Sequence, residues 1–275
     1  MKKEQPIWLG LTIGNSRLHW AGLIGETLQT WDTNHLPAAA IKEIIESWSA
    51  GIWPQEILPL KGTVSAPRDL RLYVASVVPT QTELWQAYPA VRIITLDQIP
   101  LGGIYPTLGI DRALAVWGAG KIWGWPVLVI DAGTALTFTG ADGNHQLVGG
   151  AILPGLGLQL KSLGQRTAAL PEIELPAEIP QRFALNTKEA MQSGIVYTVI
   201  AGVRDFISAW WDSYPESRIL LTGGDRTLMF TYLQTQAPEV AAKITVEPNL
   251  IFWGMRSIVN IPGLTHDEKI NQVSS

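Results

Sequence analysis

A pattern of three strands, with a polar turn after the first strand, occurs twice in this chain of 275 residues. The apolar runs span residues 7–13, 18–24 and 27–31 in the first half, and 126–130, 135–139 and 146–153 in the second. The turn after the first strand is Gly14-Asn15-Ser16 in one half and Asp131-Ala132-Gly133-Thr134 in the other. Alternating helices and strands follow each set. This repeat predicts a duplicated α/β domain with mixed sheets, the two copies facing each other around a central cleft.

Apolar periodicity predicts the remaining elements of each half. Helices are expected at 37–48, 80–87, 111–121, 186–211, 226–234 and 249–259 and after residue 155, and strands at 71–78, 91–96, 218–221 and 243–246. The predicted domains are residues 1–124 and 125–262, and a polar tail at 263–275 follows them. Residues 170–181, which include three prolines and three glutamates, are expected to form a surface loop.

The composition excludes several classes of function. Hydrophobic residues make up 47 % of the chain and charged residues 16 %, so the chain can bury a sizeable core. The sequence has no cysteine, which excludes disulfides, thiolate metal sites and cysteine nucleophiles. The net charge of −4 gives no general attraction for nucleic acid or anionic lipid, so neither is expected as a partner. Most of the 12 tryptophans are expected in the core, and Trp8 and Trp20 flank the first polar turn.

Two apolar stretches superficially resemble membrane-targeting segments. The run at 7–13 is too short for a signal peptide and continues into a polar turn without a small-residue cleavage site. Residues 113–130 are interrupted by three glycines and Pro126, which favours a helix followed by a buried strand. We therefore expect a soluble, cytoplasmic protein.

Several common catalytic motifs are absent from the sequence. There is no P-loop, no Gly-x-Gly-x-x-Gly, no nucleophile elbow and no His-Glu-x-x-His, and the four histidines lack metal-ligand spacing. What remains is a set of turns rich in Gly, Thr and Asp that follow predicted strands. The turns at 14–16 and 131–134 combine glycine with hydroxyl groups, as concave backbone turns that bind phosphate oxygens do. Either turn alone could instead be an ordinary hairpin turn.

Two glycine-rich junctions occur in the second half of the chain. Gly223 and Gly224 lie between a predicted strand and a helix, where a ribose or phosphates could pack against the helix start. Glycines at 149, 150 and 155 flank another buried strand. Both signals are weak when taken alone, because glycines before a helix are common.

Two helix starts carry polar residues that could be functional. Gly109-Ile110-Asp111-Arg112 opens a helix, where Asp111 could accept a proton from a hydroxyl and Arg112 could hold an anion. The alternative is that Asp111 only complements the helix dipole. Asn186-Thr187 opens the long helix, and Asn186 could be no more than its N-cap.

In this order, the segments resemble the type III pantothenate kinases of the actin, sugar-kinase and heat-shock ATPase superfamily. That family has Asp-x-Gly-Asn-Thr/Ser, Gly-x-Asp-Arg, Asp-x-Gly-Thr-Ala, Gly-Gly-x-Ile-x-Pro-Gly, Asn-Thr and Thr-Gly-Gly, and the match runs from residue 11 to residue 225. The resemblance implies two ribonuclease-H-like, actin-like ATPase domains that phosphorylate pantothenate with ATP in the first step of coenzyme A biosynthesis. It also implies a homodimer, with Mg²⁺ and a monovalent cation, K⁺ or NH₄⁺, as cofactors.

The resemblance further implies roles for individual residues. Asp111 would be the catalytic base on the primary hydroxyl of pantothenate, and Asp131 would bind the monovalent cation. The residues that contact pantothenate would be Tyr105, Gly109, Ile110, Asp111, Arg112 and Thr187. The residues that contact ATP would be Thr12, Gly14, Asn15, Ser16, Arg17, His19, Thr134, Gly223 and Gly224.

Thr12 departs from the family, which has an aspartate there that helps to organise metal and phosphates. Loss of an electrostatic contact of this kind can reduce the rate by roughly 10²–10³. One alternative is therefore a catalytically weak or silent homologue that acts as a regulatory or accessory factor. Another is a kinase or phosphatase of the same superfamily with a different acceptor. The presence of Asp111, Asp131 and Thr187 favours an active pantothenate kinase.

Overall fold

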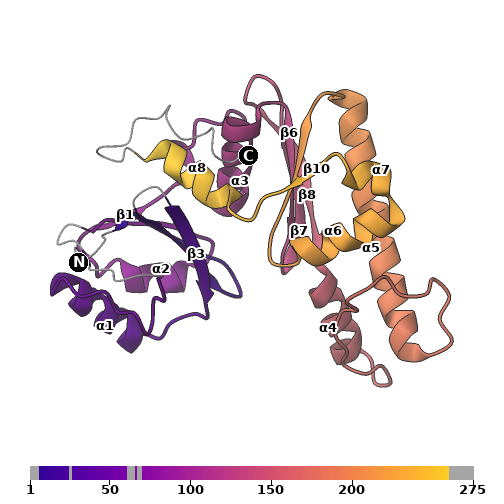
Figure 1. The fold of residues 1–275 in the computed structure, drawn as a ribbon, viewed down its shortest axis with the longest axis horizontal. Coiled ribbons are helices and arrows are strands. Elements are labelled where there is room, and N and C mark those ends of the chain that lie inside the picture. Colours follow the sequence, from indigo (N-terminus) through magenta and orange to yellow (C-terminus); the bar gives the residue numbers. More distant parts are fainter. Residues whose placement is uncertain (1–5, 25–26, 61–65, 67–69, 260–275) are drawn as a thin grey trace. The chain divides into compact units, whose positions relative to one another are not determined.

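The computed structural model describes residues 6–24, 27–60, 66 and 70–259, and these fall into two compact units (Figure 1). Within the described residues, the first unit extends to Pro100, includes 105–118 and resumes at Ile251. The second unit comprises residues 101–104 and 119–250. The chain therefore passes from unit 1 to unit 2 close to the predicted boundary at residue 124, but its last helix groups with unit 1. The predicted tail at 263–275 lies outside the described residues.

The elements alternate as the apolar pattern predicts. Unit 1 contains β1 (Pro6–Ile13), β2 (Leu18–Ile24), β3 (Thr27–Thr33), α1 (Ala38–Ser49), β4 (Leu72–Ser76), α2 (Pro79–Trp85), β5 (Val91–Ile93), the 3₁₀ helix η1 (Leu96–Gln98), most of α3 (Ile110–Trp123) and nearly all of α8 (Leu250–Ile258). Unit 2 contains β6 (Val127–Ala132), β7 (Ala135–Ala141), β8 (Leu147–Pro154), α4 (Leu156–Arg166), α5 (Thr187–Ser213), β9 (Arg218–Thr222), α6 (Arg226–Gln236), α7 (Pro238–Ala241) and β10 (Ile244–Val246). The predicted elements omit η1 and α7, since three or four residues are too few to show a helical period.

The two units contain sheets with the same topology. The strand order is β3-β2-β1-β4-β5 in unit 1 and β8-β7-β6-β9-β10 in unit 2. In each sheet the first three strands pair antiparallel, and the remaining two add in parallel beside the first strand. The predicted duplicated α/β architecture with mixed sheets is therefore confirmed.

Tryptophans form much of the core on one face of the unit 1 sheet. Trp20 stacks on Trp31, its cross-strand partner, and meets Trp85 of α2 edge to face at 5.3 Å between ring centroids. Trp85 also contacts Trp48 of α1, which packs against Trp53. Such aromatic pairs contribute about 0.5–1.5 kcal/mol each beyond the area they bury. These five of the 12 tryptophans thus hold α1 and α2 on the sheet.

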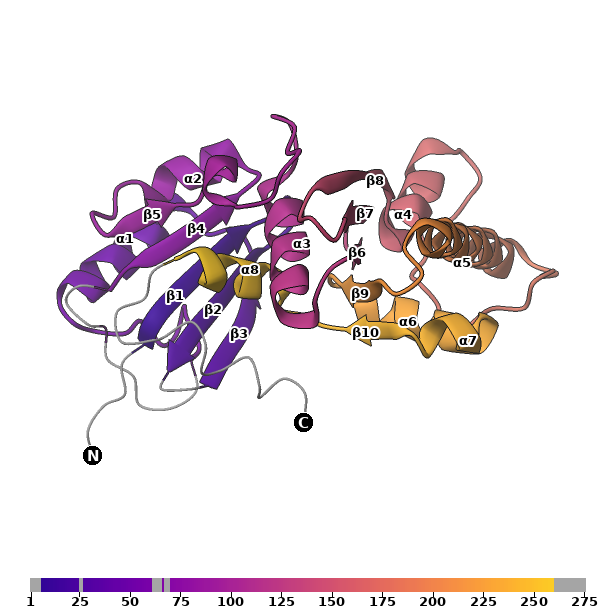
Figure 2. The same cartoon turned by 90° about the horizontal axis from the view of Figure 1, so that it is seen from above.

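Helix α8 packs on the opposite face of the same sheet (Figure 2). The Phe252 ring lies 6.1 Å from the Trp8 ring on β1 and 4.9 Å from the His19 ring on β2, measured between centroids. Gly254 sits directly against the backbone of Leu114 in α3, where a Cβ atom would collide with the Leu114 carbonyl. The close approach of α3 and α8 therefore requires glycine at residue 254.

The core of unit 2 lies between its sheet and helices α4, α5 and α6. A segment without regular structure, residues 167–186, crosses this core and packs apolar side chains such as Ile173 and Ile179 against it. Side chains of the helices bind its carbonyl groups: Gln192 donates to Glu174, Ser193 to Arg182, Tyr197 to Pro180 and Tyr232 to Pro176. The loop predicted at 170–181 is thus irregular but tied to the helices.

Among the described residues, no helix has both the length and the apolar character needed to cross a membrane.

We predict that Gly254→Ala lowers the free energy of unfolding by about 1–3 kcal/mol, because the added methyl group forces α8 away from α3. Chemical denaturation measures this change. Gly194→Ala in α5 is the matched control, since its Cβ would meet no other described heavy atom within 4 Å outside that helix's own backbone. The control should stabilise the protein by about 0.5–1 kcal/mol. Equal effects of the two substitutions would contradict the proposed packing constraint.

We also predict an alkaline stability limit that depends on Tyr232. Burial, and secondarily the negative charge of Asp225, raises the pKa of Tyr232 to about 12, above the ordinary value of 10. The stability that the neutral phenol contributes is therefore complete below about pH 10 and is lost as the pH rises through about 12. Denaturation at pH 8, 10 and 11 should show a steeper loss for the native protein than for Tyr232→Phe. At pH 8 the variant should be less stable by about 1 kcal/mol, because the hydrogen bond to Pro176 is gone. If the free energies of unfolding of the two proteins fell in parallel with rising pH, Tyr232 would not be the group responsible for the alkaline limit.

Candidate active site

The first polar turn projects from the end of β1 as an exposed loop. Gly14 N–H donates to the Arg17 carbonyl at 3.1 Å, and the Gly14 carbonyl accepts from His35 Nε2 at 2.8 Å. Between these residues, Asn15 and Ser16 are exposed. Two residues of the turn are thus exposed to solvent, and the phosphate-binding role that the sequence predicts for it stays a prediction.

The predicted ATP contacts Thr12, Arg17 and His19 lie beside this turn. Thr12 is 7 % exposed on the central strand β1 and pairs directly with His19 on β2. His19 Nδ1 contacts Asp32 of β3, and Arg17 Nη1 lies 3.7 Å from the other Asp32 carboxylate oxygen. The motif search missed Asp32, because only strand pairing brings it to the turn.

The start of α3 places Asp111 and Arg112 on different partners. The Asp111 carboxylate accepts from the Arg112 N–H at 2.8 Å, and it lies so close to Gly109 that a Cβ there would overlap it. The Arg112 side chain is buried at 8 % exposure, and its Nη1 donates to Tyr105 Oη at 3.2 Å. The structure therefore brings four predicted pantothenate contacts together in unit 1: Tyr105, Gly109, Asp111 and Arg112. Ile110, between them, is also buried.

In unit 2, three strand ends converge on residues 131–134. Gly155 N–H, after β8, donates to the Thr134 carbonyl at 2.8 Å, and Asp225 N–H, after β9, donates to the Ala132 carbonyl at 2.8 Å. Gly223 has a φ of +96° and lies against the Asp131 carboxylate and the Ala132 backbone. The predicted residues Asp131, Thr134 and Gly223 are thus neighbours, and the exposed Gly224 follows them.

Two further residues lie where these strand ends meet. Arg226 Nη1 donates to the Gly223 carbonyl at 2.8 Å, and Asp225 is the N-cap residue of α6. Neither was among the predicted site residues, although Asp225 belongs to the Thr-Gly-Gly-Asp junction. Gly155 was quoted only as part of a motif, and its close approach to the Gly133 carbonyl shows why a side chain is excluded there.

Thr187 is the first residue of α5 and is exposed. The Asn186 side chain accepts from the Glu189 N–H at 3.0 Å, so Asn186 caps the helix as the simpler interpretation proposed. Thr187 belongs to unit 2, whereas the other predicted pantothenate contacts belong to unit 1.

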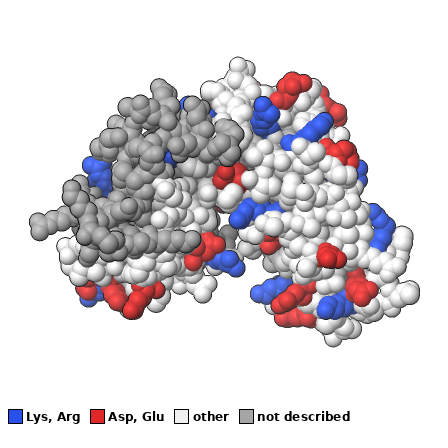
Figure 3. Space-filling view, in the orientation of Figure 1, with Lys and Arg blue, Asp and Glu red and all other residues white. Residues whose placement is uncertain are grey.

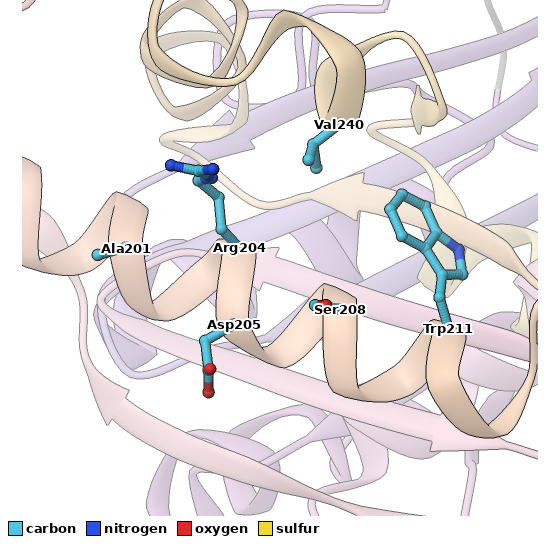
Figure 4. Close-up of a pocket in the computed structure, with 6 residues that line it drawn as sticks. All are labelled: Ala201, Arg204, Asp205, Ser208, Trp211 and Val240. Carbon is cyan, nitrogen blue, oxygen red and sulfur yellow. The ribbon is translucent and has the colours of Figure 1, made fainter.

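A surface hollow of about 380 Å³ lies elsewhere in unit 2, on α5 and α7 (Figure 4). Arg204, which lines it, forms an ion pair with Glu239 at 4.0 Å. The hollow contains none of the predicted site residues. In the described part of the chain, no three His, Asp or Glu side chains gather into a metal-binding group. The described surface in Figure 3 carries acidic and basic side chains interspersed with large uncharged areas.

Comparison with known proteins identifies the family to which this chain belongs. The family model for type III pantothenate kinase matches residues 8–209. A type III pantothenate kinase from Nostoc is 58 % identical over 262 residues, which cover 92 % of this chain and 94 % of the relative. One from Synechocystis is 44 % identical over 259 residues, which cover 93 % and 91 %.

Two solved structures share the fold. A conserved Baf family protein from Campylobacter jejuni has a TM-score of 0.55 at 20 % identity, covering 91 % of this chain and 95 % of that one. A protein of the 2-dehydro-3-deoxygalactonokinase type from Sinorhizobium meliloti has a TM-score of 0.54 at 13 % identity, covering 95 % and 99 %. These identities establish a common architecture only. The sequence relatives, in contrast, match this chain over nearly its whole length, and the chain belongs to the type III pantothenate kinase family.

Proposed function

We propose that this chain transfers the γ-phosphoryl group of ATP to pantothenate, yielding 4'-phosphopantothenate and ADP in the first step of coenzyme A biosynthesis. The observation that carries the proposal is the start of α3 in a member of this kinase family. There a half-buried carboxylate, Asp111, lies next to a buried cation, Arg112, which in turn holds Tyr105. A base and an anion-binding group side by side suit an acceptor that carries both a hydroxyl and a carboxylate.

The step that we propose needs positioning more than covalent chemistry. The hydroxyl oxygen of pantothenate attacks the γ-phosphorus, the bond to the β,γ-bridging oxygen breaks, and ADP leaves. The hydroxyl proton passes to the Asp111 carboxylate. Because the transition state of phosphoryl transfer is loose, the protein contributes mainly alignment and charge neutralisation. Arg112, Tyr105 and Thr187 would orient the acceptor.

We propose that the nucleotide uses the two related turns. The exposed backbone at residues 14–16 would hold phosphate oxygens, with Thr12, Arg17 and His19 beside it. Thr134, Gly223 and Gly224 would contact the nucleotide from unit 2, where a Cβ at Gly224 would meet open space. Thr12 itself is buried, and it offers a hydroxyl group where the family has a carboxylate.

Asp131 is the residue that we propose for the monovalent cation. Its carboxylate and the Ala132 carbonyl both lie against Gly223, and oxygen atoms of these two kinds would suit a hard cation. Mg²⁺ would enter with the phosphates of ATP, since this ion usually takes few protein ligands and keeps substrate oxygens and water. Either cation would neutralise phosphate charge.

Replacement of the proposed base, Asp111→Asn, tests its role in catalysis. We expect kcat to fall at least 10²-fold, because an amide cannot accept the hydroxyl proton, whereas the ATP-induced rise in melting temperature stays unchanged. A coupled assay of ADP release with pantothenate measures the rate. Asp97→Asn is the control, since Asp97 is likewise an aspartate in the first turn of a helix in unit 1 but is exposed.

The outcomes separate the proposals. Normal turnover of Asp111→Asn would remove Asp111 as the base. If the native protein itself releases no ADP with pantothenate, a panel of other acceptors tests the related kinases, and a blank panel favours the accessory role.

We also propose a homodimer formed through unit 2. Phe183 and Leu185, just before α5, are 84 % and 100 % exposed, and Ile152 on the edge strand β8 is 65 % exposed. Exposed apolar side chains mark interfaces where they form a contiguous patch, and we propose that these side chains form one in the dimer. Light scattering should give twice the chain mass of 30.1 kDa, and Leu185→Asp should shift the protein toward one chain mass. A native protein of single-chain mass would contradict the proposal.

A further inference from the structure

Three residues form a row across the first three strands of unit 1. Thr12 on β1 lies directly opposite His19 on β2, and His19 lies directly opposite Asp32 on β3. Directly opposed residues of neighbouring strands project from the same face of a sheet. His19 therefore has Thr12 on one side and Asp32 on the other, immediately below the turn at 14–16.

The equivalent row of three residues in unit 2 has its carboxylate on a different strand. Thr12 and Asp131 correspond, because each lies on the central strand two residues before the glycine of its turn. From Asp131 the row continues through Thr137 on β7 to Ile152 on β8. Unit 2 thus has its carboxylate on the first strand of the row, whereas unit 1 has it on the third.

Asp32 binds both basic side chains beside the turn. An ionised carboxylate only accepts hydrogen bonds, so the proton of the contact with His19 lies on Nδ1 and the ring presents Nε2 to a ligand. The second carboxylate oxygen lies 3.7 Å from Arg17 Nη1. Phe252 of α8 packs against the His19 ring at 4.9 Å between centroids and restricts its rotation.

We propose that Asp32 is a positioning residue for the nucleotide phosphates and takes over part of the task of the carboxylate missing at Thr12. It holds His19 and Arg17 in the orientation in which the guanidinium, and His19 Nε2–H once ATP-bound His19 carries a proton on both ring nitrogens, donate to phosphate oxygens. The proposal rests on the proposed kinase function. It assigns a role to a residue that no motif of the sequence contains.

The expected effect is on ATP binding rather than on the acceptor. Asp32 is 45 % exposed at its side chain, so its ion pairs contribute little to folding in water. The ion pairs instead favour ATP binding, because they already hold the side chains of Arg17 and His19 in place and so reduce the conformational entropy lost when ATP binds. Removal of the carboxylate should therefore weaken ATP binding while pantothenate binding and folding stay nearly unchanged.

The first experiment compares Asp32→Asn with Glu46→Gln. Glu46 is the matched control because it is an exposed carboxylate of unit 1 that also pairs with a basic side chain, Lys42, at 3.8 Å. We expect the KM for ATP to rise about tenfold in Asp32→Asn, which corresponds to about 1.4 kcal/mol. The KM for pantothenate should change less than twofold, and the control should match the native enzyme. An unchanged KM for ATP, or equal rises for both substrates, would overturn the proposal.

A second variant tests whether position in the row matters. In Thr12→Asp/Asp32→Asn the carboxylate moves to the other neighbour of His19, where it can again accept from the ring. We expect the KM for ATP to return to within about threefold of the native value. Additive loss in the double variant would refute the exchange of roles.

A third measurement does not require catalysis. With ATP bound, nitrogen-15 spectra of the imidazole rings should show His19 protonated at both Nδ1 and Nε2 in the native protein, and at Nε2 alone in Asp32→Asn. Calorimetry with ATP alone should show the tenfold loss of affinity even if pantothenate is not the acceptor. Failure of the kinase function would appear as an inactive native protein, whereas failure of this inference would appear as unchanged spectra and unchanged ATP affinity.

Discussion

The end of the unit 2 sheet that we propose for the nucleotide depends on a steric constraint at two glycines. A side chain at Gly155 would collide with the carbonyls of residues 133 and 134, and one at Gly223 would collide with Asp131 and Ala132. Because both positions carry only hydrogen, the ends of β6, β8 and β9 meet through direct backbone hydrogen bonds. The Asp131 carboxylate and the Thr134 backbone are thereby placed together without any long side chain to order them.

The apolar pattern predicted most of the fold, because inner strands of both sheets, such as β4, β6, β7 and β9, are buried along most of their length. The same pattern could not reveal which sheet α8 packs on. A helical period shows that a helix has an apolar face, but not which surface that face meets. The contact of Phe252 with Trp8 and His19 places α8 in unit 1, although the chain reaches it from unit 2.

The candidate site was predictable where its residues are consecutive. Gly109 to Arg112 is a motif of four adjacent residues, and the structure adds only that the Arg112 side chain turns back to Tyr105. Asp32 could not be found in this way. It lies 13 residues from its partner His19, and only the register of β2 against β3 makes them neighbours. Arg226 similarly depends on the left-handed backbone of Gly223.

The position of α8 has a consequence for the order of folding. Domains of a growing chain usually fold in the order in which they leave the ribosome. Here Trp8 and Tyr73, whose rings lie 6.5 Å apart, occupy the sheet face that α8 covers, and α8 begins only at Leu250. During synthesis that face of unit 1 lacks α8 while the whole of unit 2 is made. The first unit to be synthesised is therefore the last to be completed.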